Sequence, residues 1–444
     1  MRIGAIGLCD PGYAEEAARQ RYRGVLERFQ AAGAQVADAG LHADEAKSPP
    51  AVANLLAQHA SEPFDALLLV QAAWARPDVL LQIVRAFGRL PVVLAAPGGP
   101  IAEGVIQSTA PLAGVGSTLP ILRGHGIPCE LVWSVPGREI DLAAAMPFLR
   151  AARAVRRLRG AKLGMVGFGD MRLQTTAFDV RRLHETFGVE VESVDMLQVR
   201  QAMDALGAGE LARRREELTA GWSWQGRPDE AAVDRAVAMF LVLDRWALER
   251  GWAGVSIKCP TGVAAAMGMT PCLVGCLLAR RLHYVCENDI PGLLTQVILG
   301  HLSGQPSTYW ELYEALDDAL LLGCCGFAAE AVLDEPVKVR GFSEFLAGAG
   351  CCSRVRGGDY TLGRLGNDRA GRYVMHCVEG RAGPPPPWCE VALGPPQHPS
   401  VSFKPDKPLG GVLAALLAQH FAVVAGRWAA EMDRFARIVG IELV

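Results

Sequence analysis

Two acidic residues stand two positions apart in Cys286-Glu287-Asn288-Asp289, which follows the apolar run Leu282–Val285. Two carboxylates at the end of a strand can bind a divalent metal ion and can also move a proton between atoms of a substrate. Acidic residues are equally typical of the first turn of a helix, where they accept hydrogen bonds from backbone N–H groups. The spacing leaves open whether Glu287 and Asp289 do chemistry or cap a helix predicted over Leu293–Leu302.

The chain contains 12 cysteines, and Cys324 and Cys325 are adjacent between two glycines. The apolar run at the N-terminus is too short for a signal peptide, and the cysteine spacing is unlike that of small disulfide-rich domains. We therefore expect reduced thiols in a cytoplasmic protein. Buried unreactive thiols are the default interpretation of the pair, and a thiolate metal ligand is the alternative.

Two further polar residues lie beside apolar segments. His420 falls within a helix predicted near Val412–Ala425, where a single histidine is more often a core residue than a ligand. Lys258 follows the predicted strand Ala253–Ile257, so it is either a functional group at the strand end or a loop cation.

Arg172 follows Gly167-Phe168-Gly169 after another predicted strand. A dinucleotide-binding loop would carry a third glycine where Arg172 stands, so the segment is a weak signal for a nucleotide cofactor. Arg172 can instead hold the oxygens of a polyol, and an exposed loop arginine is the alternative.

The elements that position these residues alternate along the first part of the chain. Uninterrupted apolar strands at Ile3–Leu8, Ala66–Val70 and Pro91–Ala95 are separated by amphipathic helices. This pattern indicates a parallel sheet that is covered on both faces. A second unit begins near the basic helix Ala151–Arg159 and continues through the strand Lys162–Val166.

The C-terminal part differs in composition. Short alternating stretches such as Tyr373–Val378 and the proline run Pro384–Pro387 predict a β-rich domain, which ends in helices such as Trp428–Ile438. The predicted fold class is therefore α/β, with two Rossmann-like parallel-sheet domains followed by a β-rich C-terminal domain. We expect the boundaries to fall at residues 1–155, 156–335 and 336–444.

Charge and hydropathy exclude several classes of function. The 444 residues carry 44 Lys and Arg against 47 Asp and Glu, a formal net charge of -3. This balance gives no reason to expect binding to nucleic acid or to an anionic membrane. No apolar run reaches the roughly 18–20 residues of a membrane span. A small-molecule substrate fits these observations best.

From about residue 160 onward, the order of these motifs resembles the L-fucose/L-arabinose isomerase-like family. The first 150 residues fit that family only as a general α/β pattern. The shared features are a glycine/arginine loop, a GVEV strand, a lysine-cysteine strand end, a Pro-Cys pair, a CExDxxG segment, an HCG segment and a C-terminal histidine segment. In this chain these are Gly167–Arg172, Gly188–Val191, Lys258-Cys259, Pro271-Cys272, Cys286–Gly292, Cys324–Gly326 and Gln419–Gly426.

The resemblance implies a metal-dependent aldose–ketose (sugar) isomerase that works through an enediol. It implies a divalent metal, usually Mn²⁺, bound by Asp289 and His420, with Glu287 beside them as a ligand or base. Glu287 and Asp289 would be the catalytic pair, and Arg172 and Lys258 would contact the carbohydrate. Members of this family assemble as trimers or hexamers, so the resemblance also implies a homo-oligomer.

Three departures from the family pattern bear on this expectation. Cys324 replaces the histidine of the HCG segment, Gln419 replaces the first of two histidines, and no carboxylate lies within Lys258–Gly268. The site could bind a softer metal such as Zn²⁺ through Cys324. It could act by changed chemistry on a carbohydrate-like substrate. It could also have lost its metal and become a non-catalytic sugar-binding paralogue.

Overall fold

The computed structural model describes residues 1–10, 12–42, 48–169, 171–226, 229–341, 348–387 and 399–444. The chain divides into two compact units, Met1–Arg156 and Arg157–Val444. The three-domain division expected from the sequence stays a prediction.

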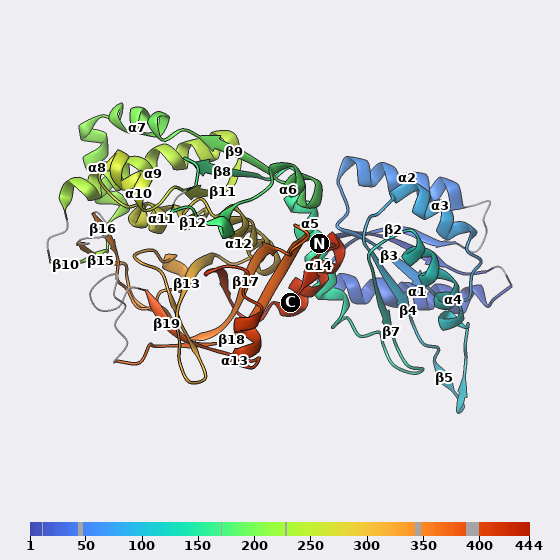
Figure 1. The fold of residues 1–444 in the computed structure, drawn as a ribbon. Helices are drawn as coiled ribbons and strands as arrows, with labels where there is room; N and C mark the ends of the chain where they lie inside the picture. The colour runs from blue at the N-terminus through green and yellow to red at the C-terminus, as the bar shows by residue number, and fades with distance from the viewer. Residues whose placement is uncertain (11, 43–47, 170, 227–228, 342–347, 388–398) are drawn as a thin grey trace. The chain divides into compact units, whose positions relative to one another are not determined.

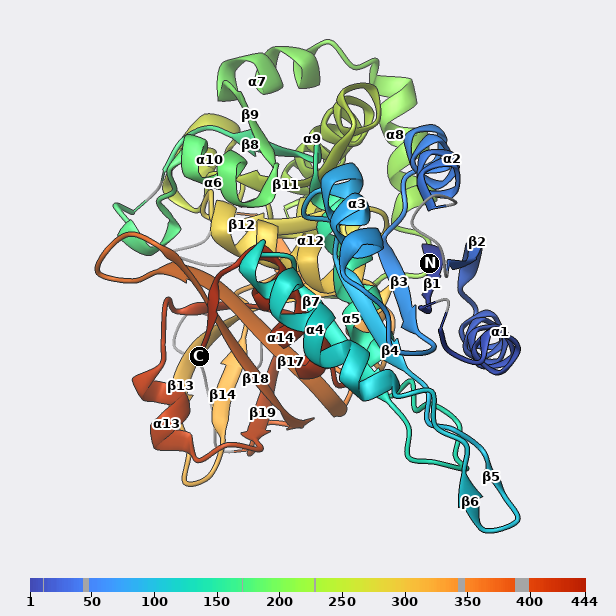
Figure 2. The same cartoon turned by 90° about the vertical axis from the view of Figure 1, so that its right-hand side faces the viewer.

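The first unit contains a five-stranded sheet with parallel pairings in the order β2-β1-β3-β4-β7 (Figure 1). A short hairpin extends away from this sheet (Figure 2). The strands are β1 (Arg2–Leu8), β2 (Gln35–His42), β3 (Ala66–Gln71), β4 (Val92–Ala96), β7 (Cys129–Trp133) and, in the hairpin, β5 (Ile101–Ala102) and β6 (Val105–Ile106). The helices are α1 (Glu15–Ala31), α2 (Ser48–Ser61), α3 (Asp78–Phe87), α4 (Pro111–Gly124) and α5 (Ala145–Leu158).

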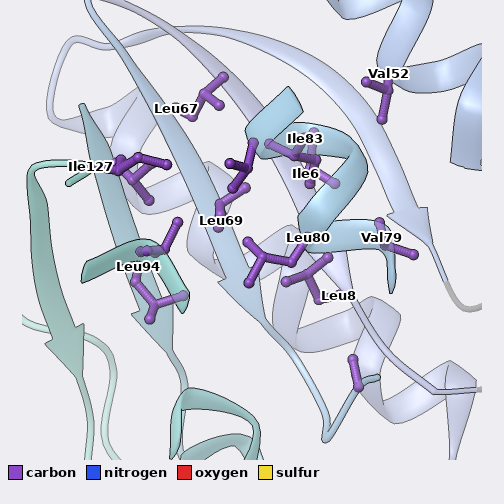
Figure 3. Close-up of a cluster of buried hydrophobic side chains, with 14 of the residues drawn as sticks. Ile6, Leu8, Val52, Leu67, Leu69, Val79, Leu80, Ile83, Leu94 and Ile127 are labelled. Carbon is purple, nitrogen blue, oxygen red and sulfur yellow. The ribbon is translucent and has the colours of Figure 1, made fainter. Parts of the chain in front are cut away.

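The core of the first unit forms because β1, β3 and β4 are apolar on both faces, as buried parallel strands must be. On one face, Leu80 and Ile83 of α3 pack against Ile6, Leu69 and other strand residues (Figure 3). Each of these four named side chains is at most 1% exposed. The predicted parallel sheet is therefore confirmed for this unit.

The second unit begins with a four-stranded parallel sheet in the order β12-β11-β8-β9. Its strands are β8 (Lys162–Val166), β9 (Glu190–Val194), β11 (Trp252–Ile257) and β12 (His283–Cys286). The accompanying helices are α6 (Val180–Phe187), α7 (Met196–Asp204), α8 (Ala208–Leu218), α9 (Glu230–Arg250), α10 (Thr261–Met267), α11 (Cys272–Leu278) and α12 (Ile290–Ser303), with short 3₁₀ helices at Gln174–Thr176 and Glu330–Val332. A small separate sheet contains β10 (Ser223–Gln225), β15 (Lys338–Gly341) and β16 (Ala349–Cys351).

The Rossmann-like description of the two sheets is not confirmed. The first sheet has the 2-1-3-4-5 order of flavodoxin-like folds, and the second has its first four positions, 2-1-3-4. Neither sheet has the 3-2-1-4-5-6 order of the Rossmann fold. The sequence pattern predicts that the strands of both sheets are parallel and buried, but it does not predict the order in which they lie side by side.

The C-terminal β-rich region closes into a barrel-like antiparallel sheet. The order β17-β20-β13-β14-β19-β18 returns to its start because β17 also pairs with β18, while β21 adds to β18 in parallel. The strands are β13 (Ser307–Ala315), β14 (Leu320–Gly323), β17 (Gly358–Asn367), β18 (Tyr373–Gly383), β19 (Ser400–Pro405), β20 (His420–Ala425) and β21 (Glu442–Leu443), and the helices are α13 (Leu409–Ala414) and α14 (Ala429–Val439).

The helix predicted near Val412–Ala425 is wrong over most of its length. Only α13 is helical, and His420 begins the strand β20. Residues 420–425 have the burial of a central strand, and β20 pairs with β13 and β17 on its two sides. Periodicity does not distinguish a short apolar strand from a buried helix, and the pairing in the barrel decides it.

Helix α12 lies between the parallel sheet and the barrel, as Figures 1 and 2 show. It contacts β11 and β12 of the parallel sheet and β13, β17 and β20 of the barrel. Its residues from Ile290 to Leu299 are all buried and, apart from Thr295 and Gln296, apolar, as in a helix enclosed on all sides. Thr295 is a polar exception, whose hydroxyl donates to Pro291 O at 2.7 Å and accepts from Leu365 N of β17 at 3.0 Å.

Within the described part of the chain, no single helix has the length and apolar character needed to cross a membrane, and only the bent pair α10 and α11 meets those criteria together.

Thr295→Val tests how α12 is joined to the barrel. The substitution leaves the buried Leu365 N–H without an acceptor, so we expect the free energy of unfolding to fall by about 1–3 kcal/mol in a denaturant titration. Ser303→Ala, at the end of the same helix, is the control and should change it by about 0.5 kcal/mol or less. Equal stability of the two variants would contradict this account.

Candidate active site

The turn after β12 places both acidic residues of the CExD segment. Glu287 and Asn288 have positive φ angles of 65° and 53°, a left-handed conformation that is uncommon for residues other than glycine. The Asn288 amide holds this turn by donating to Val166 O of β8 at 3.0 Å. Asp289 then accepts from Gly292 N at 2.9 Å as the N-cap of α12, which confirms the capping interpretation for this residue.

Asp289 is also the centre of a buried ion pair. Its side chain and that of Arg364 in β17 are both 0% exposed, and the guanidinium donates to Asp289 Oδ2. The Tyr309 hydroxyl, from β13, donates to the same oxygen. Burial acts to raise the pKa of Asp289, but Arg364 and the hydrogen bonds outweigh burial and hold this pKa below its usual value.

His420 lies beside this pair and is 2% exposed. Its Nδ1 is 3.8 Å from Asp289 Oδ2, while its Nε2 is 3.6 Å from Glu287 Oε2 and 4.0 Å from Glu311 Oε1. Burial lowers the pKa of His420 to about 4, because it outweighs the charge of Asp289, which acts to raise this pKa. The imidazole is therefore neutral near pH 7, the form that can bind a metal or accept a proton.

Glu311 is a site residue that the sequence interpretation missed. It lies on β13 directly opposite His420 in the strand register. Burial, and then the neighbouring Cys324, raise the pKa of Glu311 to about 7. A carboxyl group that titrates near neutral pH can both take and give a proton there. An acidic residue within the apolar segment Ser307–Leu312 was the signal that could have revealed it.

Cys324 is buried and close enough to affect the protonation of both Glu311 and His420. Hydrogen bonds with Cys286 and Cys325 lower the pKa of the Cys324 thiol well below its usual value. The cysteines that the structure describes are all free thiols, as expected from the sequence. A ligand role for Cys324 stays a prediction.

Lys258 and Arg172 follow neighbouring strands of the parallel sheet. The Lys258 ammonium donates to Phe168 O at 3.3 Å, and its backbone N–H donates to Val166 O at 3.0 Å. Arg172 is exposed and has a φ of 58°. The structure thus brings Glu287, Asp289, His420 and Cys324 together, whereas no contact between Arg172 and these residues is seen in the described part of the chain.

The predicted metal ligands do not form a preformed metal-binding site among the described residues. Among residues 1–10, 12–42, 48–169, 171–226, 229–341, 348–387 and 399–444, no group of three His, Cys, Asp or Glu side chains is arranged to hold a metal ion. The two oxygens of Asp289 already accept hydrogen bonds. The neutral imidazole of His420 and the carboxylates of Glu287 and Glu311 nevertheless have the donor chemistry that Mn²⁺ accepts. The predicted set of Asp289, His420 and Cys324 stays a prediction.

Arg364→Met tests the buried ion pair. Removing the guanidinium leaves the Asp289 carboxylate buried without its cation, so we expect the free energy of unfolding to fall by about 3–5 kcal/mol. The matched double variant, Asp289→Asn with Arg364→Met, should recover part of this loss because no buried charge remains. Denaturant titrations of the three proteins measure both effects, and a double variant less stable than Arg364→Met would contradict the pairing.

Comparisons with known proteins relate the chain to two curated isomerases. Sulfoquinovose isomerase from Alkalicoccus urumqiensis is 22% identical over 413 residues, which cover 87% of each chain. Sulfoquinovose isomerase from Clostridium sp. (strain MSTE9) is 27% identical over 207 residues, 45% of each chain. No family model matches the sequence.

Among solved structures, a solute-binding protein from Burkholderia multivorans covers 69% of this chain and 94% of its own, with 13% identity and a TM-score of 0.17. That similarity is too low to assign a shared fold. The two curated relatives suggest a family of sugar isomerases, which is a coarser assignment than the L-fucose/L-arabinose resemblance. They support the prediction that this chain is an isomerase.

Proposed function

We propose that this chain is an aldose–ketose isomerase that acts on a sugar through an enediol. The observation that carries the proposal is the approach of Glu287 and Glu311 to the same nitrogen of a buried, neutral histidine. Two carboxylates and an imidazole at one point are suited to moving protons between adjacent atoms of a substrate. The names of the two curated relatives support a sugar as the substrate.

The reaction moves protons without a net change in oxidation state. One carboxylate takes the proton from C2 of the aldose and returns it to C1 of the enediol. The other acid–base group moves the hydroxyl proton from O2 to O1, so that the carbonyl passes from C1 to C2. In this proposal Glu287 and Glu311 carry the protons, since both approach His420 Nε2 and Glu311 titrates near neutral pH.

Asp289 has a different part in the proposal. Its carboxylate is fully buried, and its oxygens accept from Gly292, Tyr309 and Arg364. A group so bound, with its pKa held low, stays ionised and is poorly suited to taking a proton. We infer that Asp289 positions the turn that carries Glu287 and fixes Tyr309 beside His420, whose rings are 4.7 Å apart.

A divalent metal is part of the proposal. Its donor would be the neutral imidazole of His420, with Cys324 as the further ligand that would favour a softer ion such as Zn²⁺. When bound, such a cation would polarise the two sugar oxygens between which the carbonyl moves.

Proton exchange tests the isomerase. In D₂O, we expect the wild-type chain to place deuterium at C2 of a substrate aldose, which nuclear magnetic resonance detects. Glu287→Gln and Glu311→Gln should each slow exchange by about 100-fold or more, because proton transfer loses its acceptor. Glu314→Gln, an exposed residue of the same strand as Glu311, is the matched control and should retain the wild-type rate. Absence of exchange with every aldose, including sulfoquinovose, would favour a sugar-binding protein.

Removing metal tests the cation. Dialysis against a chelator should lower the exchange rate about tenfold or more, since the carbonyl is then less polarised, and Mn²⁺ should restore it. His420→Ala should reduce the metal content measured by elemental analysis in the purified protein. If the metal-free chain keeps its full rate, the cation must be dropped from the proposal while the proton transfer stands.

A further inference from the structure

Lys258 places a positive charge at the edge of the parallel sheet where Glu287 emerges. It directly follows β11, whose last residue, Ile257, pairs with Val166 of β8 on one side and with Cys286 of β12 on the other. The carboxyl ends of parallel strands form the ligand-binding edge of such sheets. Lys258 therefore stands at the same edge as Glu287, yet the proposed proton transfer does not use it.

The aliphatic part of the Lys258 side chain packs closely against Gly167 and Gly262, which have no side chains to block it. A Cβ at Gly262 would lie 2.4 Å from Lys258 Cε, and a Cβ at Gly167 would lie 3.0 Å from Lys258 Cβ. Larger residues at these positions would displace the lysine. The stem is thus confined, and its ammonium reaches the Phe168 carbonyl beyond β8. A side chain confined in this way loses little conformational entropy when its ammonium binds a ligand.

Among the described residues, the charge of Lys258 has no partner of opposite sign. In the described part of the chain no carboxylate forms an ion pair with it, whereas Arg215, Arg280 and Arg364 of the same unit each pair with an acid. An ammonium has three N–H donors, and Phe168 O takes one of them. Two donors, and a charge without an ion-pair partner in the part of the chain that the structure describes, remain for a ligand.

The separation of Lys258 from the proton-transfer residues fits the length of a sugar. Glu287 follows β12, while Lys258 leans toward β8 on the other side of β11. Neighbouring strands are about 4.8 Å apart, so the ends of β8 and β12 are roughly 10 Å apart. This span is comparable to a hexose with a substituent on its last carbon. A substrate with its C1 and C2 at Glu287 would place that substituent near Lys258.

We infer that Lys258 binds an anionic group, a sulfonate or a phosphate, on the terminal carbon of the sugar. The inference rests on the proposed sugar isomerase, and it assigns the substrate class and the residue that selects it. An ammonium recognises either anion by charge-assisted hydrogen bonds. Both curated relatives are named for a sugar that carries a sulfo group, which is the same chemistry.

Titration calorimetry on the full chain tests this inference with sulfoquinovose, glucose 6-phosphate and glucose. We expect the wild-type chain to bind one of the two anionic sugars about tenfold or more tightly than glucose, and the tighter of them identifies the anion. Lys258→Met should abolish this preference, and Lys258→Arg should retain part of it. Lys162→Met removes a lysine at the opposite, amino end of β8 and should leave the preference unchanged.

Two results would overturn the inference. One is equal affinity of the wild-type chain for the three sugars, and the other is a Lys258→Met variant that keeps the wild-type preference. Because calorimetry measures binding without turnover, it gives an answer even if no deuterium exchange occurs. Deuterium exchange without a preference for anionic sugars would contradict the role of Lys258 alone. A preference for anionic sugars without deuterium exchange would contradict the isomerase alone.

Discussion

The buried ion pair between Asp289 and Arg364 fixes the relation between the parallel sheet and the barrel. Burying two charges costs several kcal/mol per ion, and this cost is recovered only where geometry is good and the remaining hydrogen bonds are made. Here Asp289 Oδ1 accepts from Gly292 N and so caps α12, while the Tyr309 hydroxyl donates to Asp289 Oδ2. Arg364 Nη2 donates to Thr175 O at 2.7 Å. The pair thus joins the end of β12, the start of α12 and a barrel strand at one point.

The proposed proton-transfer residues depend on that junction because they come from both sheets. Glu287 follows the last residue of β12 in the parallel sheet, while Glu311 and His420 belong to paired strands of the barrel. A shift of α12 along the barrel would separate Glu287 from His420 Nε2. The same arginine also acts at a distance, since its charge favours the neutral form of His420. The ion pair therefore sets the distance, whereas burial keeps His420 neutral against the opposing charge of Asp289.

The sequence contains the parallel sheets and part of the site, because those features have local signals. Apolar strands alternating with amphipathic helices predict buried parallel sheets, and an acid two residues before Pro291-Gly292 predicts a helix cap. The barrel is not predictable in the same way. The apolar run from His420 to Ala425 has no periodicity that separates strand from helix, and only its pairing with β13 and β17 decides.

Arg364 was missed because its partner is 75 residues away in sequence. A signal was nevertheless present, since Arg364 stands between Gly363 and Leu365 in an otherwise buried strand. A charge at such a position is stable only with a buried partner of opposite sign, so an arginine inside an apolar strand predicts a distant acid.

Lys258 shows the converse case. It stands just past the end of an apolar strand, beside glycines rather than acids, and no described carboxylate neutralises it. The two cations therefore differ in what balances their charge. Asp289 balances the charge of Arg364 within the protein, whereas we propose that a ligand balances that of Lys258. In this chain, position within a strand or just beyond its end is the sequence feature that separates Arg364, a structural cation, from Lys258, the cation that we propose binds substrate.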